Sequence, residues 1–144
     1  MLFLLAVRTL LAPASTFPQF EVRAGKYQIS ISQTATKRDT YCWGYEPDIK
    51  MAASGLGVIV IYQGSSYTPS YSAYSDLSAL RRVEWKINAD TLVVTGEGGD
   101  AHSGYDVKWV FRDGYLVRRE VRSGEFPENN YEITDYVNKP YEEE

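Results

Sequence analysis

The tyrosines of one polar tract are the residues best suited to recognition chemistry. The tract QGSSYTPSYSAYS, residues 63–75, interleaves tyrosines with small polar residues, a composition typical of a long exposed loop or an edge strand. Tyrosine offers a rigid apolar ring with a polar tip, and proteins use it where they contact partners or sugars. We therefore expect an exposed surface that binds a protein partner or a glycan, formed by Tyr62, Tyr67, Tyr71 and Tyr74 together with Trp43 and Tyr45 of a second aromatic segment. The alternative is that these rings plug the end of a barrel or cover the core.

Residues 97–106, EGGDAHSGYD, contain the single histidine of the chain, His102. Oxygen and nitrogen ligands are present, but their spacing fits neither an EF-hand nor a helical pair of zinc-binding histidines. No serine of the sequence lies in a nucleophile elbow. A hydrolase that uses the His102 loop is therefore the least favoured hypothesis, and we predict no catalytic residue, metal or cofactor.

Acidic residues offer candidate pairs for general acid–base catalysis, but a sequence contains no distance between them. The candidates are Glu46, Asp48, Glu84 and Glu97. Glu84 falls on the polar face of its expected strand, where solvent surrounds it. We expect a protein that is not an enzyme.

Cys42 is the only cysteine, which excludes an intrachain disulfide and a cysteine-based zinc site. We expect it to be a small buried residue between two aromatic neighbours.

The charge of the chain is uneven. The net charge is −4, and from residue 128 onward six acids face one base, Lys139, so this segment carries −5 and the rest +1. Without a basic stripe, binding to nucleic acid is not expected. Residues 137–144 are interpreted as an acidic tail.

The first fourteen residues, MLFLLAVRTLLAPA, are apolar apart from Arg8 and Thr9, and they end in a small-x-small pattern typical of signal peptidase sites. They are too short for a stable membrane span. We interpret residues 1–14 as a signal peptide, which predicts a secreted or periplasmic protein. The alternative is a retained segment that packs on the domain of a cytoplasmic protein.

Residues 107–121, VKWVFRDGYLVRREV, form the hairpin with which the remaining segments must pair. A three-residue loop over 112–114 pairs Phe111 with Tyr115 and places nearly all large apolar groups on one face. A two-residue loop pairs Phe111 with Leu116 instead, but sets a tryptophan opposite an arginine. We prefer the three-residue loop.

Arg119 is then the one charged side chain that points inward. It needs a carboxylate or an aromatic face as a partner.

Three further segments show the same period-two pattern. Residues 20–32 predict a hairpin about Ala24-Gly25, and residues 81–96 predict one that aligns Trp85 with Val94. In the last strand we expect Tyr131 and the residues two and four positions later to share the inner side. Residues 56–62, LGVIVIY, predict a central strand that is covered on both faces.

Roughly eight hairpin-connected strands and at most two short helices, over 48–53 and 75–81, therefore make an all-β protein. We expect residues 15–136 to form a single antiparallel β domain, an up-and-down meander that closes into a barrel or half-barrel, with a β-sandwich as the alternative. The most favoured function is a non-enzymatic binding module. A small-ligand carrier with a barrel cavity is the second hypothesis. Large inward-directed rings argue that its interior is filled instead: Trp85, Trp109, Tyr27, Tyr115 and Tyr131.

Overall fold

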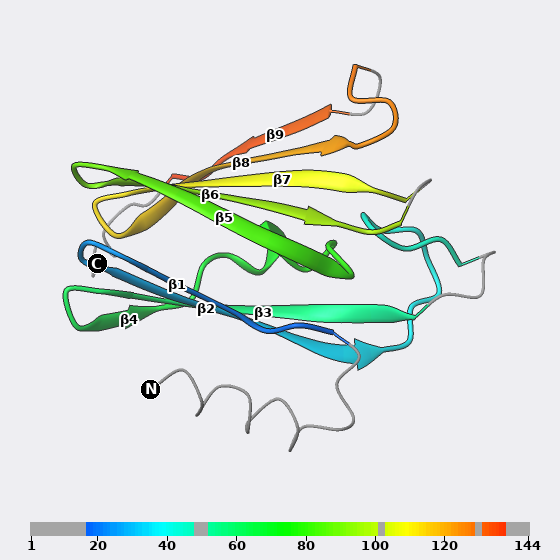
Figure 1. Cartoon of the computed structure of the whole chain (residues 1–144), viewed down its shortest axis with the longest axis horizontal. Helices are drawn as coiled ribbons and strands as arrows, with labels where there is room; N and C mark the ends of the chain where they lie inside the picture. Colours follow the sequence, from blue (N-terminus) through cyan, green and yellow to red (C-terminus); the bar gives the residue numbers. More distant parts are fainter. Residues whose placement is uncertain (1–16, 48–51, 101–102, 129–130, 138–144) are drawn as a thin grey trace, which may run out of the picture.

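A computed structural model describes residues 17–47, 52–100, 103–128 and 131–137, and these residues form two antiparallel β-sheets (Figure 1). The first sheet contains β1 (Phe20–Ala24), β2 (Tyr27–Thr36), β3 (Ala53–Tyr62) and β4 (Ser65–Tyr67). The second contains β5 (Leu80–Asn88), β6 (Thr91–Gly98), β7 (Tyr105–Arg112), β8 (Tyr115–Ser123) and β9 (Tyr131–Asp135). Within each sheet every strand pairs with its neighbour in sequence, whereas β4 and β5 do not pair, so the expected antiparallel all-β fold class is confirmed.

The two sheets lie face to face in two layers and share one apolar core (Figure 1). Alternate residues of both sheets fill this core, among them Val22, Ile29, Val60, Leu92 and Val107. No hydrogen-bonded ladder joins one sheet to the other among the described strands, and no closed barrel is formed by them.

The connection between β4 and β5, residues 68–79, runs between the two layers (Figure 1). It contains a short 3-10 helix, η1 (Tyr71–Ala73), whose Ala73 carbonyl accepts a hydrogen bond of 3.0 Å from Nε1 of Trp109. The Tyr105 hydroxyl donates to the carbonyl of Ser78 at 2.9 Å. The polar tract 63–75 was expected to be an exposed loop or an edge strand: it does supply the edge strand β4 and is exposed over much of its length, but around Ala73 and Tyr74 it is buried. The β4–β5 connection supplies acceptors to buried hydrogen-bond donors of the second sheet and packs against the core.

The β7–β8 hairpin has the two-residue loop, so the preferred three-residue loop was wrong. Phe111 pairs with Leu116, and the turn residues Asp113 and Gly114 have φ of 50° and 88°, as a type I′ turn requires. A bulge follows in β8 and restores the inward alternation. Consequently Tyr115 points outward and is 51% exposed.

Arg119 points inward as expected, is only 1% exposed, and has carboxylate partners. Its guanidinium donates to both oxygens of Asp76, at 2.5 and 2.7 Å, and to Oε1 of Glu132 at 2.8 Å. It also donates to the carbonyl of Ser72 at 2.7 Å. The buried cation therefore ties the β4–β5 connection and β9 to β8.

This pairing explains why the expected face of β9 was wrong. Glu132 lies opposite Val121 and turns inward to reach Arg119, so its neighbours Tyr131 and Ile133 lie on the outer face and are exposed. One residue of register exchanges every side chain between the two faces.

Three smaller corrections concern the other strands. The β1–β2 turn is Gly25-Lys26 rather than Ala24-Gly25, although the large apolar residues of this hairpin share the inner face as expected. Strand β3 is not covered on both faces, because Ile59 is exposed on the outer one. Trp85 pairs with Val94 as expected, but it lies on the edge strand β5 and is 43% exposed.

The two expected helices are not present as such in the described residues. Residues 80 and 81 already belong to β5, and Ala53 begins β3, while positions 48–51 lie outside the described residues.

Candidate functional site

The six aromatic residues expected to form one surface lie in three places. Tyr62 and Tyr67 flank the β3–β4 turn. Tyr71 and Tyr74 lie at η1, and Trp43 and Tyr45 lie in the β2–β3 connection. The structure therefore brings them together only in pairs.

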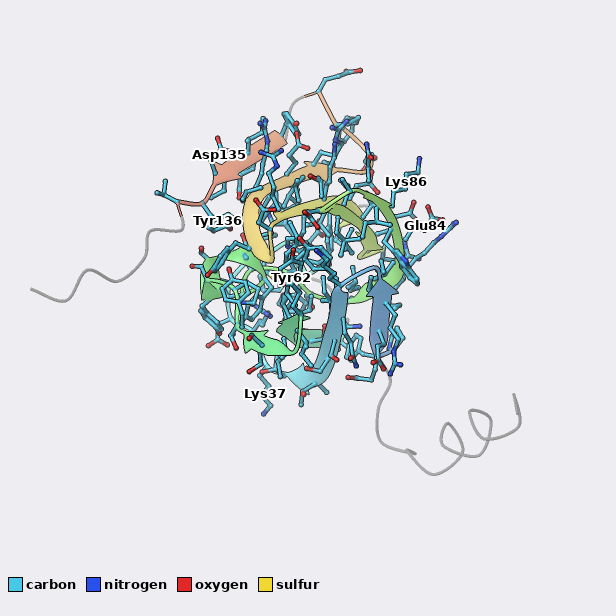
Figure 2. The ribbon with its side chains drawn as sticks, turned by 90° about the vertical axis from the view of Figure 1, so that its left-hand side faces the viewer. Lys37, Tyr62, Glu84, Lys86, Asp135 and Tyr136 are labelled. Carbon is cyan, nitrogen blue, oxygen red and sulfur yellow. The ribbon has the colours of Figure 1, made fainter. Side chains whose placement is uncertain are left out.

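The two-residue turns of β1–β2, β3–β4, β5–β6 and β7–β8 gather at one end of the molecule (Figure 1). Figure 2 looks onto this end, where Tyr62 is labelled near the centre. We call it the hairpin end: the turns at 25–26, 63–64, 89–90 and 113–114.

Hydrogen bonds hold the hairpin end together across the two sheets. The Tyr27 hydroxyl of the first sheet donates to the carbonyl of Asp90 at 2.8 Å and accepts the amide N–H of Gly114 at 3.0 Å. Burial raises the pKa of the Tyr27 hydroxyl, which keeps it a donor at neutral pH. Lys26 and Asp90 add an ion pair at 3.6 Å between turns of opposite sheets. The turns are thus fixed relative to one another.

A groove of about 450 Å³ opens at the hairpin end between the tips of β3–β4 and β7–β8. We call it the tyrosine groove. It is lined by Tyr62, Gln63, Ser65, Ser66, Tyr67, Asp113, Gly114 and Tyr115. The rings of Tyr67 and Tyr115, one from each sheet, meet edge to face with centroids 5.5 Å apart. This arrangement is favoured by the ring quadrupoles and makes a rigid aromatic corner.

Gly114 and Tyr67 fix the shape of the groove. At Gly114 a β-carbon would lie 2.6 Å from the ring of Tyr62, and φ is 88°, so only glycine lets Tyr62 cover this turn. Burial raises the pKa of the Tyr67 hydroxyl, although a hydrogen bond from the main chain of Leu116 opposes this. Tyr67 is therefore neutral at physiological pH.

The remaining four predicted residues lie in the β4–β5 and β2–β3 connections. Tyr74 is only 7% exposed and packs edge to face on Tyr71, which is 72% exposed, with centroids 5.5 Å apart. Trp43 packs on Tyr105 at 6.4 Å, and the Tyr45 hydroxyl donates to the carbonyl of Arg38 at 3.1 Å. These positions lie away from the tyrosine groove.

Tyr62 and Tyr67 were predicted, and the other six lining residues were not named as binding residues: Gln63, Ser65, Ser66, Asp113, Gly114 and Tyr115. Tyr115 was expected to point inward, because the three-residue loop was preferred, and Asp113 and Gly114 were treated as turn residues only. The Asp-Gly pair at 113–114 is a strong signal for a two-residue type I′ turn, and weighing it more heavily would have turned Tyr115 outward.

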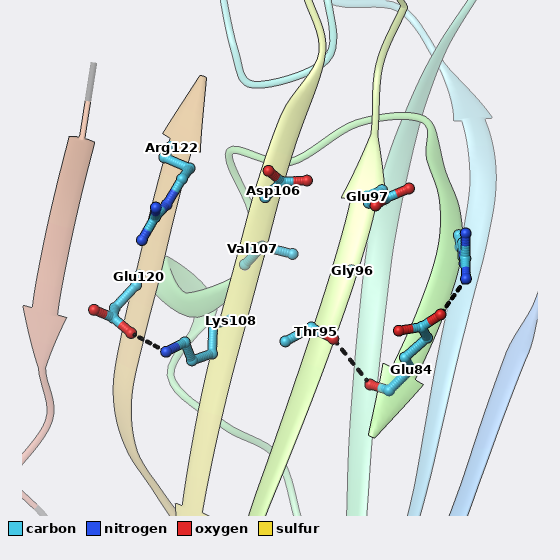
Figure 3. A pocket seen from close by; sticks show the side chains of 10 residues that line it. Glu84, Thr95, Gly96, Glu97, Asp106, Val107, Lys108, Glu120 and Arg122 are labelled. Atoms are coloured by element: carbon cyan, nitrogen blue, oxygen red, sulfur yellow. Dashed lines mark hydrogen bonds and ion pairs between the residues drawn. The ribbon is translucent and has the colours of Figure 1, made fainter. Parts of the chain in front are cut away.

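A second hollow, of about 290 Å³, lies on the outer face of the five-stranded sheet (Figure 3). Its walls are two cross-strand rows of side chains. One row runs Glu84, Thr95, Lys108, Glu120 and the other Arg82, Glu97, Asp106, Arg122.

Most charges of this face are neutralised by their neighbours. Lys108 Nζ lies 3.0 Å from Glu120, and Arg82 pairs with Glu84 (Figure 3). Hydrogen bonds from Tyr131 and Lys108 lower the pKa of Glu120. Such mutual pairing is typical of a solvated β-surface and indicates no particular ligand.

The interior of the described structure is filled. The void between the sheets, lined by Ile29, Val94 and Trp109 among others, has a volume of only about 10 Å³. Ligand sites for small molecules are usually about 300–1,000 Å³.

Two sites considered from the sequence lie outside the described residues, namely His102 and Asp48. Among the residues that the structure does describe, no group of three or more histidine, cysteine or acidic side chains is placed to hold a metal ion. Cys42 is partly buried, and burial raises the pKa of its thiol. Within the same part of the chain, no helix has the length and apolarity needed to cross a bilayer.

No protein-family model matches the sequence, and it matches no curated protein and no solved structure. The function must therefore be argued from the groove itself.

Proposed function

We propose that this chain is a non-enzymatic binding module that recognises a protein partner or a glycan through exposed tyrosines. The observation that carries this proposal is the aromatic corner of the tyrosine groove. Tyr67 and Tyr115 come from different sheets, yet their rings meet at 5.5 Å and leave Tyr115 half exposed to solvent. Aromatic side chains held rigidly at the surface bind with little loss of conformational entropy.

The rigidity of the hairpin end supports binding without rearrangement. Tyr27, Asp90 and Gly114 are joined by hydrogen bonds across the sheets, so the groove is formed before a ligand arrives. A preformed site avoids the cost of ordering its loops on association.

The carrier and hydrolase alternatives find less support. An internal void of about 10 Å³ is far smaller than an organic ligand. The lining of the tyrosine groove holds one carboxylate, Asp113, and neither a second carboxylate nor a histidine to form the pair that hydrolases commonly use.

We also infer that the two sheets form a half-barrel. In support, β1 lies beside β5 at one edge of the layers, and Tyr67 of β4 contacts Tyr115 of β8 towards the other.

An exported location, secreted or periplasmic, is likewise a proposal, because residues 1–14 lie outside the described residues. N-terminal sequencing of the protein from its cells tests it. A mature chain that starts near Ser15 is expected, and a retained Met1 would favour the cytoplasmic alternative.

Affinity capture with the full chain tests the binding function. We expect the double variant Tyr67→Ala/Tyr115→Ala to lose the captured protein or glycan. The matched control is Tyr71→Ala, because Tyr71 is more exposed than Tyr115 but lies away from the groove. Equal capture by both variants, each shown to be folded at the temperature of the assay, would contradict the proposal.

A further inference from the structure

We propose that the ligand of the tyrosine groove is a neutral oligosaccharide. This inference rests on the proposed binding function and narrows its ligand to one chemical class. It depends on the charge of the groove, on the free polar groups along its rim, and on its size and shape.

The charge of the groove disfavours acidic ligands. Its lining residues include no lysine, arginine or histidine, and Asp113 contributes a negative charge. Lys26, a base of the hairpin end, already pairs with Asp90 at 3.6 Å. A phosphate, sulfate or carboxylate group would therefore find no cation among the lining residues and would be repelled by Asp113. Sulfated or sialylated glycans, nucleic acids and phospholipid headgroups do not fit.

The rim of the groove offers hydrogen-bonding groups without partners. Gln63, Ser65, Ser66 and Asp113 all line it, and none of their side chains bonds to another residue in the described part of the chain. An amide, two hydroxyls and a carboxylate provide both donors and acceptors. This set matches the hydroxyl groups of a sugar ring, each of which can donate and accept.

The aromatic corner matches the other half of a sugar. One face of many pyranose rings carries only C–H groups and packs on an aromatic ring, while the hydroxyls project from the edge. Tyr115, with half of its surface exposed, offers such a ring, and Tyr67 supports it at an interplanar angle of 75°. Apolar contact from the corner and hydrogen bonds from the rim thus reach one ligand simultaneously.

The size of the groove also favours a small ligand over a protein. A volume of about 450 Å³ lies within the range of about 300–1,000 Å³ that is usual for small-molecule sites. A stable protein interface buries roughly 800 Å² on each partner, more than a groove formed by the tips of two hairpins supplies by itself. Recognition of a protein is therefore an outcome that the test must distinguish.

Isothermal titration of the full chain with defined sugars tests this inference. The neutral probes are maltohexaose, cellohexaose, xylohexaose and chitohexaose, and the anionic probes are sialyllactose and a heparin hexasaccharide. We expect at least one neutral probe to bind, Tyr115→Ala to weaken its binding by about tenfold or more, and Tyr71→Ala to leave it unchanged. Asparagine also tolerates positive φ, so Asp113→Asn leaves the turn undisturbed. This variant tests whether the Asp113 carboxylate accepts a hydrogen bond from the sugar.

Two results separate this inference from the proposed function. If no neutral probe binds, or if the anionic probes bind better, the inference is wrong. If in that case a captured protein is still lost by Tyr67→Ala/Tyr115→Ala, the binding function stands with a protein as its partner. If neither sugar binding nor capture depends on the two tyrosines, both proposals fail.

Discussion

Tyr67 of β4 and Tyr115 of β8 form an edge-to-face pair with ring centroids 5.5 Å apart, although they belong to different sheets. The pair closes one side of the tyrosine groove and connects the two layers near their edge. Its geometry therefore serves the stability of the fold as well as the proposed recognition.

A double-mutant cycle measures the contact between these rings. We expect Tyr67→Ala and Tyr115→Ala to couple by about 0.5–1.5 kcal/mol in the free energy of unfolding. Either substitution alone already removes the edge-to-face contact, so the double variant should lose less than the sum of the two single variants. Urea unfolding of the two single variants and the double variant provides the value. Strictly additive effects would show that the rings do not interact in solution.

We expect the loss of the Asp76 carboxylate to cost more stability than the loss of the Arg119 charge that it neutralises. Asp76→Asn removes one negative charge from a guanidinium that is 1% exposed, and we expect a loss of about 2 kcal/mol or more. Arg119→Met removes the buried charge together with its need for partners, so its cost should be smaller. Both are measured by urea unfolding at neutral pH. A larger loss for Arg119→Met would mean that the ion network stabilises the fold more than its desolvation costs.

The lowered pKa of Glu120 predicts that the stability of the fold depends on pH. Hydrogen bonds from Tyr131 and Lys108 lower its pKa below the ordinary 4.5, so its charged form is favoured in the folded state. A lowered folded-state pKa contributes stability above the unfolded-state value, and this contribution disappears as pH falls through the folded-state pKa. We expect Glu120→Gln to lower the free energy of unfolding at pH 7 by about 1 kcal/mol and by less at pH 3. Tyr131→Phe should reproduce part of the pH 7 effect. A deficit of equal size at both pH values would exclude the charge as its cause.

Ala89 offers a stabilising substitution at the hairpin end. It has a φ of 53°, a conformation that costs an alanine about 1 kcal/mol and glycine much less. We therefore expect Ala89→Gly to raise the free energy of unfolding by up to about 1 kcal/mol. Ala35→Gly, at an exposed position of β2, is the control and should destabilise by about 0.5–1 kcal/mol. If Ala89→Gly also destabilises, the turn does not have this conformation in solution.

The inner faces of most strands were predictable because alternation is a local property. Val22 and Ile29 in the first hairpin, and Leu92 and Val94 in β6, lie inside as their spacing indicates. In a strand with one buried side, apolar and polar residues therefore alternate along the sequence.

The faces of β8 and β9 could not be predicted in this way, because distant groups decide them. The bulge in β8 places Arg119 on the inner face, where it meets Asp76 of the β4–β5 connection, and Glu132 of β9 turns inward to the same guanidinium. Nothing in the sequence around Arg119 names that partner. Tyr115 was missed for a local reason instead, because the three-residue loop was preferred although the Asp-Gly pair favours the two-residue turn that directs Tyr115 outward.

The most direct test of the account is a map of the bound ligand on the chain. With the captured or titrated ligand added, amide and aromatic NMR resonances of Tyr67, Gly114 and Tyr115 are expected to shift, while those of Tyr45, Tyr71 and the charged outer face do not. Shifts confined to the charged face, or to the connections that carry Tyr45 and Tyr71, would contradict the assignment of the tyrosine groove as the binding site.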